Sequence, residues 1–230
     1  MSKGAWNAMQ ELYKQIIKLG KKYDANKIIL FGSRARGDHK DSSDIDLAVY
    51  GMPEEKRAYF WSEIEELPTL LEIDIVYITD NADKQLIDNI EKDGLILMNR
   101  ITEKHDKFKK AVDRLQESIE EYEQCELLSS RDGVIQRFEF CIELLWKVLK
   151  IYLEDQGYQD VYSPKAVMKK AFLDGVIKDE QVWIQLLEDR NRTSHIYDEA
   201  AAEGIYKNIR NRYIIMFNEI SHVLDEKIAN

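Results

Sequence analysis

The sequence predicts an α+β protein in which a mixed sheet with helices is followed by an all-helical bundle. Two observations support this prediction. Short runs rich in β-branched residues alternate with helical patterns up to about residue 100. Beyond about residue 105 the strand patterns stop, and helical periodicity continues to the end of the chain. A length of 230 residues suits two domains, which we place at residues 1–102 and 105–230.

The elements of the first domain follow from hydrophobic spacing and from helix breakers. The predicted order is a helix over 5–23, a strand over 27–31, a Gly-Ser turn and polar loop, a strand up to residue 50, a helix from residue 53, a strand over 70–78, a helix over 83–92 and a strand over 95–98. Pro53 suits the first turn of its helix, and Pro68 lies just beyond the end of that helix.

The second domain is predicted to be a helical bundle. Apolar residues at helical spacing predict helices over 105–128 and 131–156, one that begins at Ser163-Pro164, and two more over 179–197 and 200–228. The aromatic residues of the second of these helices also lie at helical spacing, and we assign them to the core: Phe138, Phe140, Trp146 and Tyr152.

Composition excludes several classes of protein. The formal net charge is −10 and both domains are acidic, which argues against a large nucleic-acid-binding surface without excluding a local basic site. No apolar run is long enough for a membrane span and no signal-peptide pattern is present, so a cytoplasmic protein is expected. Cys125 and Cys141 are expected to be buried, reduced thiols, and the four scattered histidines do not predict a zinc site.

The first candidate site is a set of carboxylates beside a Gly-Ser turn. Asp44 and Asp46 are two residues apart on a predicted strand, so they share one face and repel each other unless a cation lies between them. Asp74 is an equally unusual carboxylate inside a later apolar strand. Gly32-Ser33 directly follows a strand and offers backbone N–H groups and a hydroxyl to a phosphate. The three carboxylates together suit a hard divalent metal such as Mg²⁺.

This pattern resembles the nucleotidyltransferase superfamily of DNA polymerase β, in its minimal nucleotidyltransferase branch. The resemblance covers residues 27–98 and is carried by the segments GSRARG, SDIDL and EIDIV. It implies that Asp44, Asp46 and Asp74 ligate two Mg²⁺ ions and that Gly32 and Ser33 hold the β- and γ-phosphates of ATP. Asp74 would also favour deprotonation of the attacking hydroxyl.

The two arginines of the GSRARG segment are candidates for the charge of the triphosphate. Either Arg34 or Arg36 could bind the triphosphate, and one of them could instead be a solvated loop residue. We retain Arg36 as the nucleotide-binding residue. The implied reaction is in-line attack of an acceptor hydroxyl on the α-phosphorus, with pyrophosphate as the leaving group. These residues do not identify the base.

A second candidate site lies near residue 190. Arg190 and His195 are five positions apart, about 140° around a helix, so spacing alone favours an ordinary polar helix end. However, residues 108–220 resemble the helical nucleotidyltransferase substrate-binding family, a branch of the HEPN domains. The segments QRFEFCIELLWK, Ser163-Pro164 and DRNRTSHIYD carry this resemblance. It implies an R-x4-H-x-Y motif of Arg190, His195 and Tyr197, in which the first two act on RNA across a dimer cleft.

Together the two resemblances predict one leading function. The chain would transfer AMP from ATP to Tyr197 of its own or a partner HEPN domain, and would so restrain a HEPN ribonuclease as in a toxin–antitoxin pair. One alternative is a small-molecule, aminoglycoside-like nucleotidyltransferase whose helical domain binds the acceptor. Another is a HEPN ribonuclease toxin with a non-catalytic front domain. A homodimer is expected, whereas the number of AMP units and the RNA target are not specified by the sequence.

Overall fold

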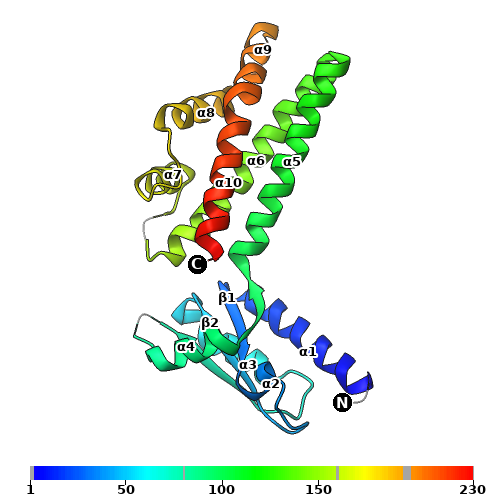
Figure 1. Cartoon of the computed structure of the whole chain (residues 1–230), viewed down its shortest axis with the longest axis vertical. Coiled ribbons are helices and arrows are strands. Elements are labelled where there is room, and N and C mark those ends of the chain that lie inside the picture. Colours follow the sequence, from blue (N-terminus) through cyan, green and yellow to red (C-terminus); the bar gives the residue numbers. More distant parts are fainter. Residues whose placement is uncertain (1–2, 80, 159–160, 194–197, 230) are drawn as a thin grey trace. The chain divides into compact units, whose positions relative to one another are not determined.

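The protein is described by a computed structural model that covers residues 3–79, 81–158, 161–193 and 198–229. It divides into two compact units, the front unit (residues 1–100) and the helical unit (residues 101–230) (Figure 1). The predicted fold class is confirmed, since the front unit contains a mixed sheet with helices and the described part of the helical unit contains helices alone.

The front unit is built on four strands. Its elements are α1 (Lys3–Lys22), β1 (Lys27–Phe31), α2 (Gly32–Arg36), β2 (Ile45–Tyr50), α3 (Glu54–Glu65), β3 (Ile73–Ile78), α4 (Lys84–Asp93) and β4 (Leu95–Asn99). The strand order is β3-β2-β1-β4. Strand β1 is antiparallel to both of its neighbours, whereas β2 and β3 are parallel. A parallel pair needs a crossover connection, and α3 provides it.

The alternation of side chains along β2 separates an apolar core from a polar face. Ile45, Leu47 and Val49 project into the main core, together with Ile16 of α1 and Phe60 of α3. The opposite face of β2 begins with Asp46 and continues with Ala48, which packs in a much smaller apolar cluster with Ile90 of α4. The sheet therefore carries its carboxylate on the less covered face.

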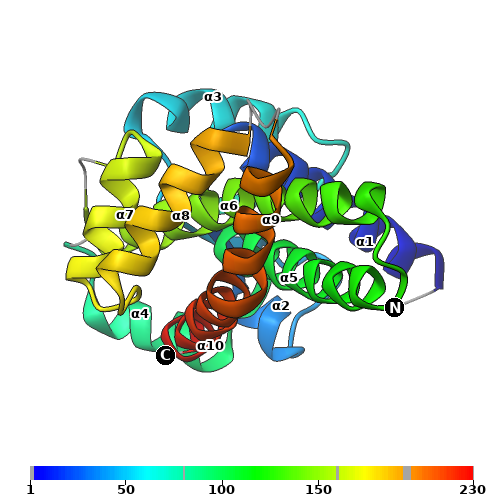
Figure 2. The ribbon, with the colours of Figure 1, turned by 90° about the horizontal axis from the view of Figure 1, so that it is seen from above.

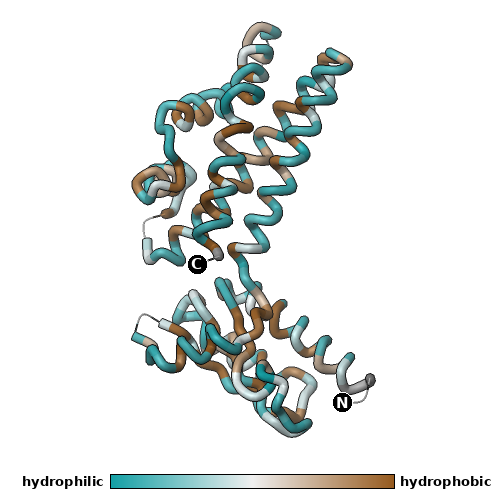
Figure 3. The backbone as a smooth tube through the Cα atoms, in the orientation of Figure 1, coloured by the Kyte–Doolittle hydropathy of each residue, from teal (hydrophilic) through white to brown (hydrophobic). Residues whose placement is uncertain are grey.

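The helical unit packs three long helices and several shorter ones. Its elements are α5 (Arg100–Cys125), α6 (Leu128–Asp155), α7 (Pro164–Leu173), α8 (Glu180–Thr193), α9 (Glu199–Asn208), the π-helical segment η1 (Ile209–Tyr213) and α10 (Ile214–Ala229). Phe217 of α10 packs edge-on against Phe108 of α5, with 5.9 Å between ring centroids. In two perpendicular views α7 and α8 lie on the side of α6 away from α5 (Figures 1 and 2). Hydrophobic residues recur along the long helices (Figure 3).

Several local predictions are corrected by the structure. Residues 32–36 form the short helix α2 where a turn and loop were predicted, and the last predicted helix is divided by η1. Phe140 is 56% exposed rather than part of the core, and Cys125 is exposed, whereas Cys141 is buried as predicted. Among the described residues, no helix combines the length and the apolar character that crossing a membrane requires.

Candidate functional site

Two of the predicted carboxylates meet across the sheet. Asp46 of β2 and Asp74 of β3 are register partners in a parallel pair, so their side chains project from the same face. Asp44 is exposed and immediately precedes β2, which begins at Ile45. The expectation that Asp44 and Asp46 both lie on the strand is therefore wrong by one residue. The third carboxylate belongs to the loop that leads into the strand.

The charges of these carboxylates act on one another. The pKa of Asp46 is raised, first by burial and then by repulsion from Asp74 and Asp44. The positive charges of Arg36 and Arg34 oppose this rise without cancelling it. Asp46 therefore gives up its proton less readily than an ordinary carboxyl, and a bound cation would relieve the repulsion.

The Gly-Ser turn lies directly against the Asp46 carboxylate. Phe31, the last residue of β1, is the register partner of Asp46, so the chain turns at this point. Gly32 has a left-handed φ of 70°, and a Cβ atom placed there would lie 2.1 Å from Oδ2 of Asp46. Glycine is thus required both by its backbone conformation and by the close approach. Ser33 follows it, half-buried, in α2.

The two arginines of α2 have different surroundings. Arg34 is buried, and its guanidinium donates hydrogen bonds to the backbone carbonyls of Asp41, Ser43 and Asp44. These bonds engage Arg34 inside the protein, so the structure does not favour it as a triphosphate ligand. Arg36 is exposed, and its ion pair with Asp38 lies at the surface, so we retain Arg36 as the candidate for contact with a nucleotide.

The candidate metal ligands of the front unit are of the chemical type that a hard divalent cation binds. Asp44, Asp46 and Asp74 offer only carboxylate oxygens, which Mg²⁺ prefers, and two of them are paired across adjacent strands. Within the described part of the chain, no three His, Cys, Asp or Glu side chains already converge on one point. Convergence of the three carboxylates on one ion would therefore need rotation of their side chains.

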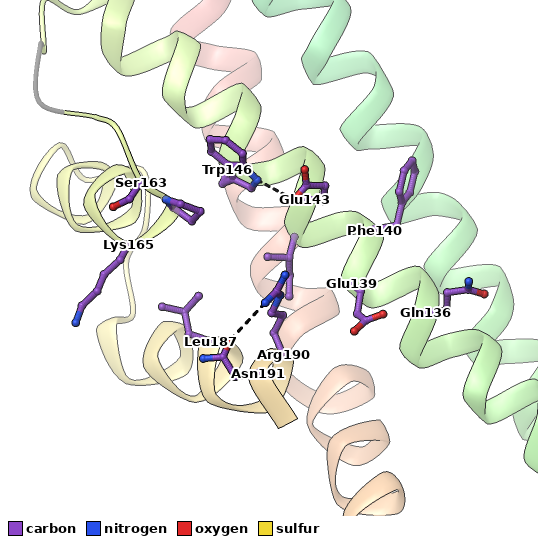
Figure 4. Close-up of a pocket in the computed structure, with 12 residues that line it drawn as sticks. Gln136, Glu139, Phe140, Glu143, Trp146, Ser163, Lys165, Leu187, Arg190 and Asn191 are labelled. Carbon is purple, nitrogen blue, oxygen red and sulfur yellow. Dashed lines mark hydrogen bonds between the residues drawn. The ribbon is translucent and has the colours of Figure 1, made fainter. Parts of the chain in front are cut away.

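A cavity of about 670 Å³ opens between α6, α7 and α8 in the helical unit (Figure 4). Arg190 of α8 lies in it and extends toward Glu143 and Trp146 of α6 (Figure 4). The pKa of Glu143 is lowered by hydrogen bonds from Lys147 and Trp146 and, more weakly, by the charge of Arg190. The cavity thus brings a carboxylate and an indole of α6 together with a guanidinium of α8.

The end of α8 is held by polar contacts on both sides of Arg190. Asp189 is 1% exposed and accepts hydrogen bonds from Asn208 at 2.7 Å and from the Tyr213 hydroxyl at 2.5 Å. Because Tyr213 lies in η1, the π-helical segment presents this donor to Asp189. Thr193 is hydrogen-bonded to Glu139 of α6. His195 and Tyr197 lie outside the described residues.

Comparison with protein families assigns both units. Residues 103–226, more than half of the chain, match the family described as "Nucleotidyltransferase substrate binding protein like". The chain belongs to this family. Residues 14–103 match the family described as "Polymerase beta, Nucleotidyltransferase", so the substrate-binding-like unit follows a nucleotidyltransferase domain.

Individual relatives agree with this assignment. The chain is 31% identical over 106 residues to "Putative protein adenylyltransferase MJ0604" of Methanocaldococcus jannaschii, covering 46% of this chain and 73% of that protein. It is 35% identical over 81 residues to "Probable ribonuclease HepT" of Haemophilus influenzae, covering 34% of this chain. The chain spans only 56% of the length of that ribonuclease.

A solved substrate-binding domain of a nucleotidyltransferase from Haemophilus influenzae is 24% identical to this chain. The superposition has a TM-score of 0.46 and covers 51% of this chain and 96% of that one. The family assignment rests on the two family matches and on the relative from M. jannaschii.

Some residues of these sites were missed by sequence reasoning. Phe140 and Trp146 were assigned to the core; both line the cavity of the helical unit, although Trp146 also packs against the core. Phe140 lies two positions from the fully buried Phe138, which is more than half a helical turn away, so this spacing could have separated them. For Arg34 of the front unit, no sequence pattern indicated its burial or its partners, because those partners are backbone carbonyls.

Proposed function

We propose that this protein is a Mg²⁺-dependent nucleotidyltransferase that transfers AMP from ATP to a hydroxyl group, that of Tyr197 in its own or a partner helical unit. The observation that carries the proposal is the pairing of Asp46 with Asp74 on one face of the sheet, directly against Gly32. Carboxylates that repel one another on one face of the sheet suit the metal ions that assist phosphoryl transfer.

Each residue of the front unit then has a role. Asp44, Asp46 and Asp74 would hold two Mg²⁺ ions, which when bound neutralise charge on the triphosphate. The backbone of Gly32 and the hydroxyl of Ser33 would bind the β- and γ-phosphates. Arg36 would add positive charge beside them.

The bonds exchanged in the reaction are those of a phosphoryl displacement. The acceptor oxygen forms a bond to the α-phosphorus of ATP, and the bond from that phosphorus to pyrophosphate breaks. Asp74 would receive the hydroxyl proton of the acceptor. An acceptor held in line with the leaving group is all that the helical unit must supply.

The helical unit would be the target of this activity. One relative is named as a ribonuclease and another as a protein adenylyltransferase, and this chain has similarity to both. On the proposed mechanism, RNA would bind at Arg190 and His195 in a homodimer. AMP on Tyr197, two positions from His195, would introduce a negative phosphate that repels RNA. The enzyme would thus restrain its own ribonuclease.

The cavity supports a second candidate function. Its volume of about 670 Å³ lies in the range of small-molecule sites, and Glu139 and Glu143 on its wall suit a cationic acceptor. In that case the helical unit would present a small molecule, such as an aminoglycoside-like amine, to the front unit. Labelled AMP would then move to the small molecule rather than to protein.

A transfer assay separates the two functions. Protein purified from cells is treated with phosphodiesterase, repurified and incubated with Mg²⁺ and ATP labelled at the α-phosphate. We expect label on wild-type protein and none on Asp46→Asn or Tyr197→Phe. Tyr162→Phe is the matched control, because Tyr162 is an 82% exposed tyrosine elsewhere in the helical unit. Full labelling of Tyr197→Phe would contradict the assigned acceptor.

A second assay tests the ribonuclease. Cellular RNA is incubated with wild type, Asp46→Asn and His195→Ala protein. Cleavage should increase in Asp46→Asn, which cannot modify itself, and should disappear in His195→Ala. RNA that stays intact with every variant would remove the ribonuclease from the proposal.

A further inference from the structure

Arg34 is buried beside the candidate metal ligands, and it donates its hydrogen bonds to backbone carbonyls. It is only 6% exposed. Its Nε donates to the carbonyl of Ser43 at 2.9 Å and to that of Asp44 at 3.1 Å. Its Nη2 donates to the carbonyls of Ser43 at 2.6 Å and Asp41 at 3.2 Å. One guanidinium therefore holds three carbonyls of the loop that leads into β2.

These contacts fix the backbone on both sides of Asp44. The carbonyl of Asp44 accepts from Arg34, and the next amide, that of Ile45, donates to the carbonyl of Glu72 at 2.9 Å. Asp44 is thus held between α2 and the beginning of the parallel ladder. Its side chain stays exposed, which leaves the carboxylate free for a ligand.

The same contacts argue against a direct role for Arg34 in binding phosphate. A guanidinium that turned its Nε and Nη2 toward a nucleotide would lose the four hydrogen bonds by which it holds the loop carbonyls. The planar fork of arginine suits a set of carbonyls at fixed positions, and lysine cannot reproduce it.

We propose that Arg34 is the positioning residue that fixes Asp44 so that its carboxylate, with those of Asp46 and Asp74, binds a divalent cation before the nucleotide arrives. This inference rests on the proposed function, since it concerns the same metal site. Arg34 acts through Asp44 and does not touch the substrate. Its loss should therefore weaken metal binding even when no nucleotide is present.

The test is a titration of the full-length protein with Mn²⁺ in the absence of nucleotide, in which free Mn²⁺ is followed by electron paramagnetic resonance. We expect Arg34→Lys to bind Mn²⁺ on the order of 10-fold more weakly than wild type. The matched control is Arg57→Lys, because Arg57 also donates to a backbone carbonyl, that of Met52, but lies on α3 away from the carboxylates. Arg57→Lys should bind Mn²⁺ as wild type does.

A double-mutant comparison shows whether Arg34 acts through Asp44. In an Asp44→Asn background, adding Arg34→Lys should cause no further loss of Mn²⁺ affinity. In the transfer assay, Arg34→Lys should lower kcat and leave the KM for ATP unchanged. If Arg34→Lys does not fold, as judged by circular dichroism, Arg34→Gln replaces it, because glutamine keeps a planar N–H donor.

The outcomes are distinct. If wild type binds Mn²⁺ and folded Arg34→Lys or Arg34→Gln binds it equally well, the inference about Arg34 is overturned and the proposed function stands. A raised KM for ATP with unchanged Mn²⁺ affinity also overturns it, in favour of a direct phosphate contact. If wild type itself binds no Mn²⁺ without nucleotide, the inference is overturned, and the transfer assay with Mg²⁺ and ATP decides the proposed function separately.

Discussion

The front unit and the helical unit build their polar sites in opposite ways. In the front unit, residues far apart in sequence, Asp46 and Asp74, are brought together by strand register and keep their mutual repulsion. In the helical unit, the buried Asp189 is satisfied by donors from two other segments. The first arrangement leaves charge available for a ligand, whereas the second uses charge to hold a helix end in place.

This difference predicts which property of the protein a substitution at each site should change. Changes at the front carboxylates should act on ligand binding and chemistry and have small or even favourable effects on stability. Changes around Asp189 should act first on stability, and on Arg190 only as a consequence. Each of the following experiments tests one side of that comparison.

The largest effect is expected for Gly32→Ala. The new methyl group would clash with the Asp46 carboxylate and displace it, so transfer of labelled AMP should fall about 100-fold. Gly37→Ala is the matched control, since Gly37 has a similar φ of 79° but nothing within 4 Å of the added atom. Both variants should lose about 1 kcal/mol of stability from backbone strain. Equal activities would contradict the close approach.

Asp189→Asn should destabilise the helical unit by about 2 kcal/mol, because the amide that replaces the charge places a donor among donors. The measurement is the free energy of unfolding from a urea titration. Asp179→Asn, at the residue just before α8, is the control. There the side chain caps exposed backbone amides of α8, and asparagine caps as well as aspartate. A loss as large as that of Asp189→Asn in this control would contradict the assignment.

Thr193→Val should cost about 1 kcal/mol, since it removes the hydroxyl that bonds Glu139 while keeping the shape of the side chain. Thermal unfolding of Thr193→Val, Glu139→Gln and the double variant measures whether the two residues act together. We expect the double variant to lose less than the two single variants would lose if they were independent. Additive losses would mean that the contact does not hold α8 to α6.

The smallest effect concerns Asp46. Because its pKa in the folded protein is raised, the folded state keeps its proton to higher pH than the unfolded state does. The stability contributed by this group is therefore lost as pH rises above about 3.9, the ordinary value for Asp. Asp46→Asn should be more stable than wild type at pH 7, by less than about 1 kcal/mol after solvent screening, and no more stable at pH 3. Urea titrations at the two pH values measure this difference, and a destabilised variant at pH 7 would contradict the repulsion.

Much of the fold was predictable from local pattern. Strand periodicity located β1, and Ser163-Pro164 located the start of α7. The π-helical segment at 209–213 was not, because the apolar spacing of the fifth predicted helix continues through it, and its contact with Asp189 through Tyr213 is not visible in local pattern.

The candidate sites divide in the same way. The carboxylates were recognisable because charged side chains are unfavourable in or beside an apolar strand, and Gly32 because the Gly-Ser pair directly follows a strand. Arg34 was not, because a buried arginine that holds backbone carbonyls looks in sequence like a phosphate ligand. A polar residue can bind a ligand or stabilise the fold. Which of the two it does depends on its hydrogen-bond partners in the folded protein, and the local sequence pattern does not reveal them.

The central claim is that the front unit modifies the helical unit at Tyr197. It is tested most directly by the intact mass of the dephosphorylated, phosphodiesterase-treated protein before and after incubation with ATP and Mg²⁺, followed by peptide mapping of residues 190–200. The account predicts a mass increase of one or more AMP units that maps to Tyr197 and is absent from Asp46→Asn. An unchanged mass in wild-type protein, or AMP on another residue, would contradict it.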